Sequence, residues 1–124
     1  MVGFPPGRIV KIDDRSFNFS VATKMMDLMA GLSGATSLDP FDGMLFDFGV
    51  EGELVMSPRG MLFPIEVAFI KEDGTISEIS ALFNPYGHNI MSMGKVRYAL
   101  EVPLGFFEKN ALVVGSKFNL GEVG

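Results

Sequence analysis

The stretch FPIEVAFIKEDGT, residues 63–75, decides the fold of this chain. Its apolar side chains alternate with the others, as they do in a strand that buries one face. The side chains on that face are Phe63, Ile65, Val67 and Phe69. We therefore expect residues 63–70 to form a strand that runs through the core.

A turn signal follows this strand at Asp73 and Gly74. A type I′ turn requires a positive φ at both central residues, and Asp-Gly is among the pairs that meet this requirement most readily. We therefore predict a hairpin with a positive φ at Gly74 and a return strand over residues 75–83.

A second strand is predicted in GMLFDF, residues 43–48. The period of two places Met44, Phe46 and Phe48 on one face and Asp47 on the other. This pattern predicts a strand with one buried face and one solvent-exposed face.

Shorter elements are expected on either side. A turn signal within residues 9–21 predicts a hairpin of two short strands, and residues 95–102 read as another strand. Pro103 is suited to the first position of a helix, which we expect to end near Asn110. Residues 113–118 then form a turn and a last short strand.

A helix is predicted over residues 23–32, with Thr23 as its N-cap and Gly31 or Gly34 as its stop. Its apolar residues recur at helical spacing and are Met25, Leu28, Met29 and Leu32. A methionine stripe is suited to a promiscuous binding face, but methionine more often fills gaps in a core. We therefore expect this stripe to be part of the core.

The composition indicates one folded domain with spare apolar surface. The chain has 124 residues, 48% of them hydrophobic and 20% charged, with a mean hydropathy of +0.32. This length is typical of a single domain, which we place at residues 9–124 after an extended arm at residues 1–8. Apolar surface that remains after the core is filled usually marks a contact with a partner.

The charge and the cysteine count exclude several classes of protein. The net charge is −5 and the ten basic residues are not clustered, so we expect no binding to nucleic acid or to an anionic membrane. The absence of cysteine removes disulfides, thiolate nucleophiles and cysteine-based metal sites. The N-terminal sequence lacks an apolar stretch of signal-peptide length, so we expect a cytoplasmic protein or a component of a macromolecular particle.

Three landmarks in this order resemble the domain-of-unknown-function 192 family. They are GL at 31–32 followed by GMLF at 43–46, PIEVAFI at 64–70 leading into DGTI at 73–76, and YALEVP at 98–103 with GFF at 105–107 and VG at 114–115. The resemblance covers roughly residues 21–120. It implies a β-rich α+β fold with a curved or barrel-like, mostly antiparallel sheet and two short helices, and it implies no established activity.

The sequence departs from the family before the strand at residues 63–70. The Met-Lys-Asn-Thr that is usual there appears here as PRGM, residues 58–61. If that segment forms a site in relatives, only Arg59 keeps a cationic role in this chain.

No catalytic, metal or cofactor motif is evident. The sole histidine, His88, lies in a predicted loop, where we interpret it as a solvated or capping residue rather than a general base. The acidic residues have no spacing typical of metal ligands, and no glycine-rich phosphate loop is present. We therefore expect a protein that is not an enzyme and has no cofactor.

The remaining candidates are two acids in apolar strands, Glu66 and Glu101. A pair of acids on one face of a sheet could raise a pKa for acid–base chemistry, but such acids more often pair with an arginine or lie on the solvent-exposed face. Arg59 and Arg97 are the available partners. These four residues define the ligand-binding site that the sequence predicts.

Two functions remain open from the sequence. The first is a non-catalytic structural or binding module that self-associates or joins protein partners in a larger assembly, such as a particle or virion accessory protein. Its contacts would be made by the N-terminal arm and by residues 90–93. The second is a domain that binds a small polar ligand near Arg59, Glu66, Arg97 and Glu101.

Overall fold

The structure, a computed structural model, describes residues 3–58, 60–82 and 87–119. Two short helices and nine strands lie in this part of the chain. In chain order they are β1 (Gly7–Ile12), β2 (Arg15–Ala22), α1 (Met25–Ala30), β3 (Gly43–Gly52), β4 (Val55–Met56), β5 (Ile65–Ile70), β6 (Ile76–Leu82), β7 (Ile90–Met91), β8 (Val96–Pro103), α2 (Phe106–Lys109) and β9 (Phe118–Asn119).

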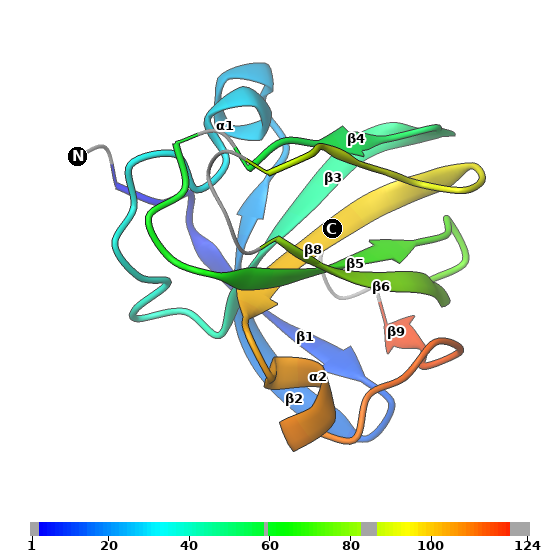
Figure 1. Ribbon diagram of the computed structural model, residues 1–124. Helices are drawn as coiled ribbons and strands as arrows, with labels where there is room; N and C mark the ends of the chain where they lie inside the picture. The colour runs from blue at the N-terminus through cyan, green and yellow to red at the C-terminus, as the bar shows by residue number, and fades with distance from the viewer. Residues whose placement is uncertain (1–2, 59, 83–86, 120–124) are drawn as a thin grey trace.

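One curved sheet forms the body of the protein (Figure 1). Its described strands follow the order β6-β5-β8-β3-β2-β1-β9, and β4 pairs with β7 in a separate two-stranded ribbon. Neighbours in the large sheet are antiparallel except β2 and β3, which are parallel because α1 lies in the crossover between them. The predicted fold class, a β-rich curved and mostly antiparallel sheet with two short helices, is confirmed.

The curved sheet carries a hydrophobic cluster on each face. In Figure 1, α1 and β4 lie at the top of the molecule, and α2 and β9 lie at the bottom. Ile65, Val67 and Phe69 of β5 belong to the cluster on the α1 side, as the alternation predicted. The expectation of a solvent-exposed face on β3 was wrong, because Leu45 is fully buried in the other cluster.

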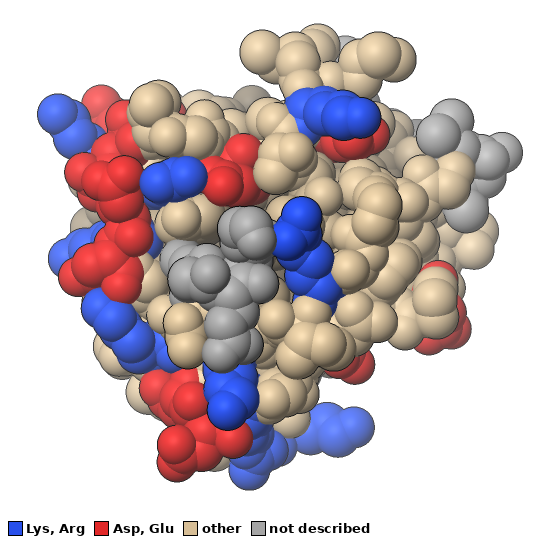
Figure 2. Space-filling model, turned by 180° about the vertical axis from the view of Figure 1, so that it is seen from behind, with Lys and Arg blue, Asp and Glu red and all other residues tan. Residues whose placement is uncertain are grey.

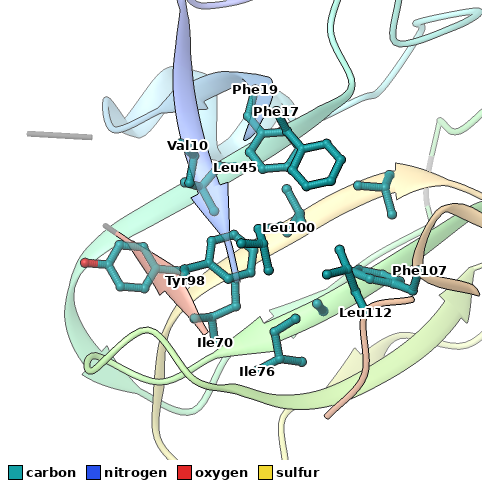
Figure 3. Close-up of a cluster of buried hydrophobic side chains, with 14 of the residues drawn as sticks. Val10, Phe17, Phe19, Leu45, Ile70, Ile76, Tyr98, Leu100, Phe107 and Leu112 are labelled. Carbon is teal, nitrogen blue, oxygen red and sulfur yellow. The ribbon is translucent and has the colours of Figure 1, made fainter. Parts of the chain in front are cut away.

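The cluster on the α2 side brings together residues from both ends of the chain. Figure 3 shows Phe17 and Phe19 of β2 facing Leu100 of β8, with Phe107 of α2 and Leu112 at the same cluster. The rings of Phe17 and Phe106 lie 5.1 Å apart between centroids. Both helices of the prediction exist, and α2 docks through its phenylalanines as expected.

The hairpin between β5 and β6 differs from the predicted turn type. Gly74 has a φ of +93°, as predicted, but Asp73 does not share the positive φ that a type I′ turn needs. The Gly74 N–H instead donates to the Lys71 carbonyl at 2.9 Å, and the Lys71 N–H donates to the Thr75 carbonyl at 2.9 Å. The loop is therefore one residue longer, with Gly74 in the left-handed position that closes it.

The predicted helix starts were both wrong. Pro103 is the last residue of β8, and α2 begins after Gly105, whose φ of +90° turns the chain out of the sheet. Lys24 rather than Thr23 precedes α1, with no side-chain cap. Gly31 ends α1 as predicted, with a φ of +50°.

The described part of the N-terminal arm packs against its own chain. The Pro5 carbonyl accepts a hydrogen bond from the Ser20 hydroxyl at 2.6 Å, and the Pro6 carbonyl accepts one from the Val21 N–H at 3.1 Å. The first strand begins at Gly7, two residues before the domain boundary that the sequence suggested. No helix in the described ranges is both long and apolar enough to cross a membrane.

Candidate ligand-binding site

A cavity of about 890 Å³ lies on the α1 side of the sheet. Its walls come from α1 and the turn after it, from β3, from β4 and the residues that follow, and from β8. The described lining residues are Met25, Leu28, Met29, Ala30, Gly31, Leu32, Ser33, Phe46, Phe48, Val55, Met56, Ser57, Pro58, Met61, Gly87, Asn89 and Glu101. Most of the lining side chains are thus apolar, although polar atoms make up about half of the exposed lining, and Glu101 is the one charged side chain among the described lining residues.

The helix α1 forms a rim of the cavity rather than part of the core. None of its six residues is buried, and Met25 and Met29 are 70% and 79% exposed. The prediction that this methionine stripe packs into the core was therefore wrong for these two residues. Leu32, one turn further on, is buried as expected.

Three glycines shape the lip between α1 and the segment after β4. Gly31 ends the helix with its N–H donating to the Asp27 carbonyl at 3.0 Å. The Gly34 N–H then donates to the Gly60 carbonyl at 2.9 Å, which ties the turn to the residues that follow β4. An ideal Cβ on Gly60 would collide with the Ser33 side chain, so this close approach requires glycine.

Glu101 lies in the middle of the sheet, on the face that the cavity covers. Its register partners are Met44 on β3 and Val67 on β5, and both are buried in the cluster on the α1 side. The residue is only 4% exposed, and within the described structure its Oε1 has no hydrogen-bond partner. Burial raises the pKa of the Glu101 carboxyl to about 8, because the charged form has lost its hydration.

Glu66 lies on the opposite face of the sheet and has a structural role. Its register partner is Val102, so it is offset by one residue from the pair that contains Glu101. Its Oε1 accepts hydrogen bonds from the backbone N–H groups of Gly105 at 3.1 Å and Phe107 at 3.5 Å. Glu66 thereby holds the start of α2 against β5.

Arg97 pairs with neither of the two predicted acids. Its Nε and Nη2 donate to the two carboxylate oxygens of Asp47 at 3.0 and 3.3 Å, and Nη1 donates to Glu72 at 3.2 Å. The guanidinium also lies over the Tyr98 ring, 5.0 Å from its centroid. The predicted ion pairs of Arg97 with Glu66 or Glu101 were therefore wrong.

The four predicted site residues do not gather at one place. Glu101 lines the cavity, Glu66 holds α2, and Arg97 belongs to an ion-pair group with Asp47 and Glu72. Arg59 lies outside the described residues. Sequence reasoning identified the acid in the cavity but missed its walls, since the methionine spacing that marks the rim also fits a core helix.

Titratable residues elsewhere in the described chain do not form a metal site. No group of three or more His, Asp or Glu side chains comes together there in a way that could hold an ion. Figure 2 shows basic and acidic side chains side by side along one edge of the molecule, with mostly uncharged surface over the rest of that view.

Comparison with known proteins agrees with the landmarks in the sequence. The family model of DUF192, whose description is "Uncharacterized ACR", matches residues 8–120. This chain belongs to the DUF192 family. No curated protein matches it in sequence.

Two solved structures are similar to this DUF192 chain. A protein from Sinorhizobium meliloti 1021, described as a candidate transcription regulator, has a TM-score of 0.86 and 25% identity, covering 96% of this chain and 97% of its own. A protein of unknown function from Novosphingobium aromaticivorans has a TM-score of 0.82 and 20% identity, covering 91% and 84%. The second likeness, at this identity, shows the fold alone.

Proposed function

We propose that this DUF192 domain binds a small molecule in the cavity beside α1, with the Glu101 carboxyl as its main polar contact. One observation carries this proposal: an acid that is 4% exposed and has an unpartnered oxygen lies on the wall of a cavity of about 890 Å³. A buried polar atom without a partner costs roughly 1–3 kcal/mol, which a ligand that supplies the partner would recover.

The cavity also has the character of a ligand site. Natural sites enclose roughly 300–1,000 Å³ and combine apolar walls with a few polar groups that fix orientation. Here apolar side chains that retain some exposure, Leu28, Phe48 and Val55 among them, line the cavity together with the single acid. General acid–base catalysis uses a positioned partner for the reacting proton. Glu101 is the one titratable side chain in the described lining, so we propose binding without catalysis.

Two matched substitutions on α1 test the site. Ala30 lines the cavity, whereas Met26 is 83% exposed on the same helix and does not line it. We expect Ala30→Phe to fill part of the cavity and weaken binding of the neutral fluorescent probe N-phenyl-1-naphthylamine at least tenfold. Met26→Phe should bind the probe as the wild type does, because it adds its ring outside the cavity.

Fluorescence titration of the three proteins gives the comparison. Equal weakening by both variants would show that the probe covers the outside of the helix. Absence of probe binding to the wild type would remove the proposed function.

A protein assembly is the second candidate function, favoured by exposed apolar side chains outside the cavity. Met91 in β7 is 59% exposed and Met93 just after it is 89% exposed, in the segment 90–93 that the sequence suggested. Met56 and Met61, which lie outside the core strands that the sequence predicted, are buried. The surface available to a partner is therefore smaller than the sequence indicated.

If the protein associates through the segment around β7, its molecular mass in solution should fall when Met93 is replaced by a charged residue. We expect Met93→Glu to lower the association state measured by sedimentation velocity, because a charge would be desolvated in the contact. A wild-type protein that sediments as a monomer at high concentration would contradict this candidate and leave ligand binding alone.

A further inference from the structure

We propose that the ligand of this cavity is an apolar compound with an amino group, and that the amino group lies at the buried end against the Glu101 carboxylate. This inference rests on the proposed function and names the chemical class of the ligand. An ammonium group has three donors and no acceptor, and a carboxylate has only acceptors, so the two groups are complementary.

The charges around the cavity favour a cation over an anion. Described titratable side chains on or beside the segments that form its walls include Lys24 and Asp27 at α1, Glu51 on β3, Glu53 before β4 and His88 between two lining residues. None of these five lines the cavity in the described part of the chain. An anionic ligand would therefore meet the acid of Glu101 without a described cation to offset it.

The strands beside β8 supply no cation to Glu101 either. On β3 and β5 its direct partners, Met44 and Val67, are apolar. Asp47 on β3 is held by Arg97, and Glu66 on β5 points to the other face. Among the described groups packed around it, Glu101 is thus an acid without a counter-ion, and a ligand cation would supply one.

The apolar lining fits the rest of such a ligand. Met25 and Met29 are flexible and polarizable side chains at the rim, and Phe46 forms part of the wall. Methionine adapts its shape to apolar surfaces more readily than branched side chains do. An alkyl or aromatic body would replace the solvent that now meets Met25 and Met29, while the amino group reaches Glu101.

Binding of an amine moves one proton. Because Glu101 is mostly protonated at neutral pH, a ligand that arrives as an ammonium ion forms the ion pair only after the Glu101 proton leaves to solvent. A ligand that arrives as a free amine takes that proton itself. In both cases the bound state holds an ammonium and a carboxylate, and the charge-assisted hydrogen bond forms away from water.

This proton release sets the pH dependence of affinity. Below about pH 8 the fraction of ionised Glu101 falls about tenfold per pH unit, and so does the affinity for an ammonium ligand. Above about pH 8 the affinity should level off until the amine itself loses its proton near about pH 10. A neutral ligand that accepts a hydrogen bond from protonated Glu101 would show the opposite trend, with affinity falling above about pH 8.

Competition with N-phenyl-1-naphthylamine separates the ligand classes. Hexylamine, hexanol and hexanoate share one alkyl chain and differ in the charge of the end group. We expect hexylamine to displace the probe at least tenfold more effectively than hexanol at about pH 8, with this advantage shrinking about fivefold at about pH 7. In Glu101→Gln the advantage and its pH dependence should both disappear, while the neutral probe still binds.

Each other outcome overturns a definite part of the account. If hexanol and hexylamine displace the probe equally well, or if neither displaces it, the amine class is refuted and the proposed function still stands. If hexanoate displaces the probe better than hexylamine does, and Arg59→Gln removes this preference, the cavity selects an anionic rather than a cationic end group. Failure of the probe itself to bind the wild type removes the proposed function together with this inference.

Discussion

Replacement of Glu101 by glutamine is expected to stabilise the folded protein at neutral pH by about 3 kcal/mol. The usual pKa of this acid is 4.5, and burial raises it to about 8 in the folded protein. Between these two values the unfolded chain loses the proton while the folded chain keeps it, so the wild type loses stability as the pH rises. Glutamine does not titrate, and its variant escapes this loss.

The stabilisation of the folded protein by Glu101→Gln should therefore increase with pH. Urea unfolding of both proteins should give similar free energies near about pH 4.5 and a difference that increases up to about pH 8. Glu66→Gln is the matched control, because the Glu66 carboxylate already accepts two backbone hydrogen bonds and an amide there should bring no stabilisation. A Glu101→Gln variant that gains nothing as the pH rises would show that the wild-type carboxylate is already compensated.

Substitution of Gly74 by alanine is expected to destabilise the protein by about 3 kcal/mol. The residue has a φ of +93°, which strains any side chain, and an added Cβ would lie 2.5 Å from the backbone oxygen of Phe118. That oxygen belongs to β9, and the Phe118 N–H donates to the Gly74 carbonyl at 2.8 Å. The substitution would therefore disturb both the hairpin and the contact that holds the last strand.

Gly94 provides the control for this substitution. An added Cβ there would have no atom within 4 Å, and its φ is not in the positive range. Thermal unfolding of Gly94→Ala should match the wild type closely, whereas Gly74→Ala should unfold at a clearly lower temperature. Equal melting temperatures of the two variants would contradict the structure of this turn.

Local patterns were enough to predict most elements of the fold. The alternation in β5, the glycine that closes the β5–β6 hairpin and the glycine that ends α1 each depend on a few neighbouring residues. The burial of Leu45 could not be predicted in this way. It depends on β2 lying parallel beside β3, which is a pairing between distant segments.

The candidate site also depends on pairing between distant segments, which local sequence patterns do not predict. The sequence marked Glu66 and Glu101 as acids in apolar strands, but the strands pair with Glu66 opposite Val102. This offset of one residue places the two acids on opposite faces of the sheet. The register is set by pairing across the whole sheet, so alternation within each strand could not reveal it.

Helical spacing alone also misplaced Met25 and Met29. An apolar stripe shows that a helix has an apolar face, but not what covers that face. In this protein the helix rests on the sheet through Leu28 and the turn at Leu32, and the methionines are left at the rim of the cavity.

The most direct test of the account is the titration of the Glu101 side chain itself. The carboxyl carbon can be followed by NMR as the pH changes, with its signal assigned by its loss in Glu101→Gln. We predict a midpoint near pH 8 in the free protein, as burial without a partner requires, and a midpoint at least one pH unit lower with saturating hexylamine. A midpoint near 4.5 in the free protein would contradict the account, because the carboxylate would then already be paired or hydrated and the cavity would offer no unsatisfied acid to a ligand.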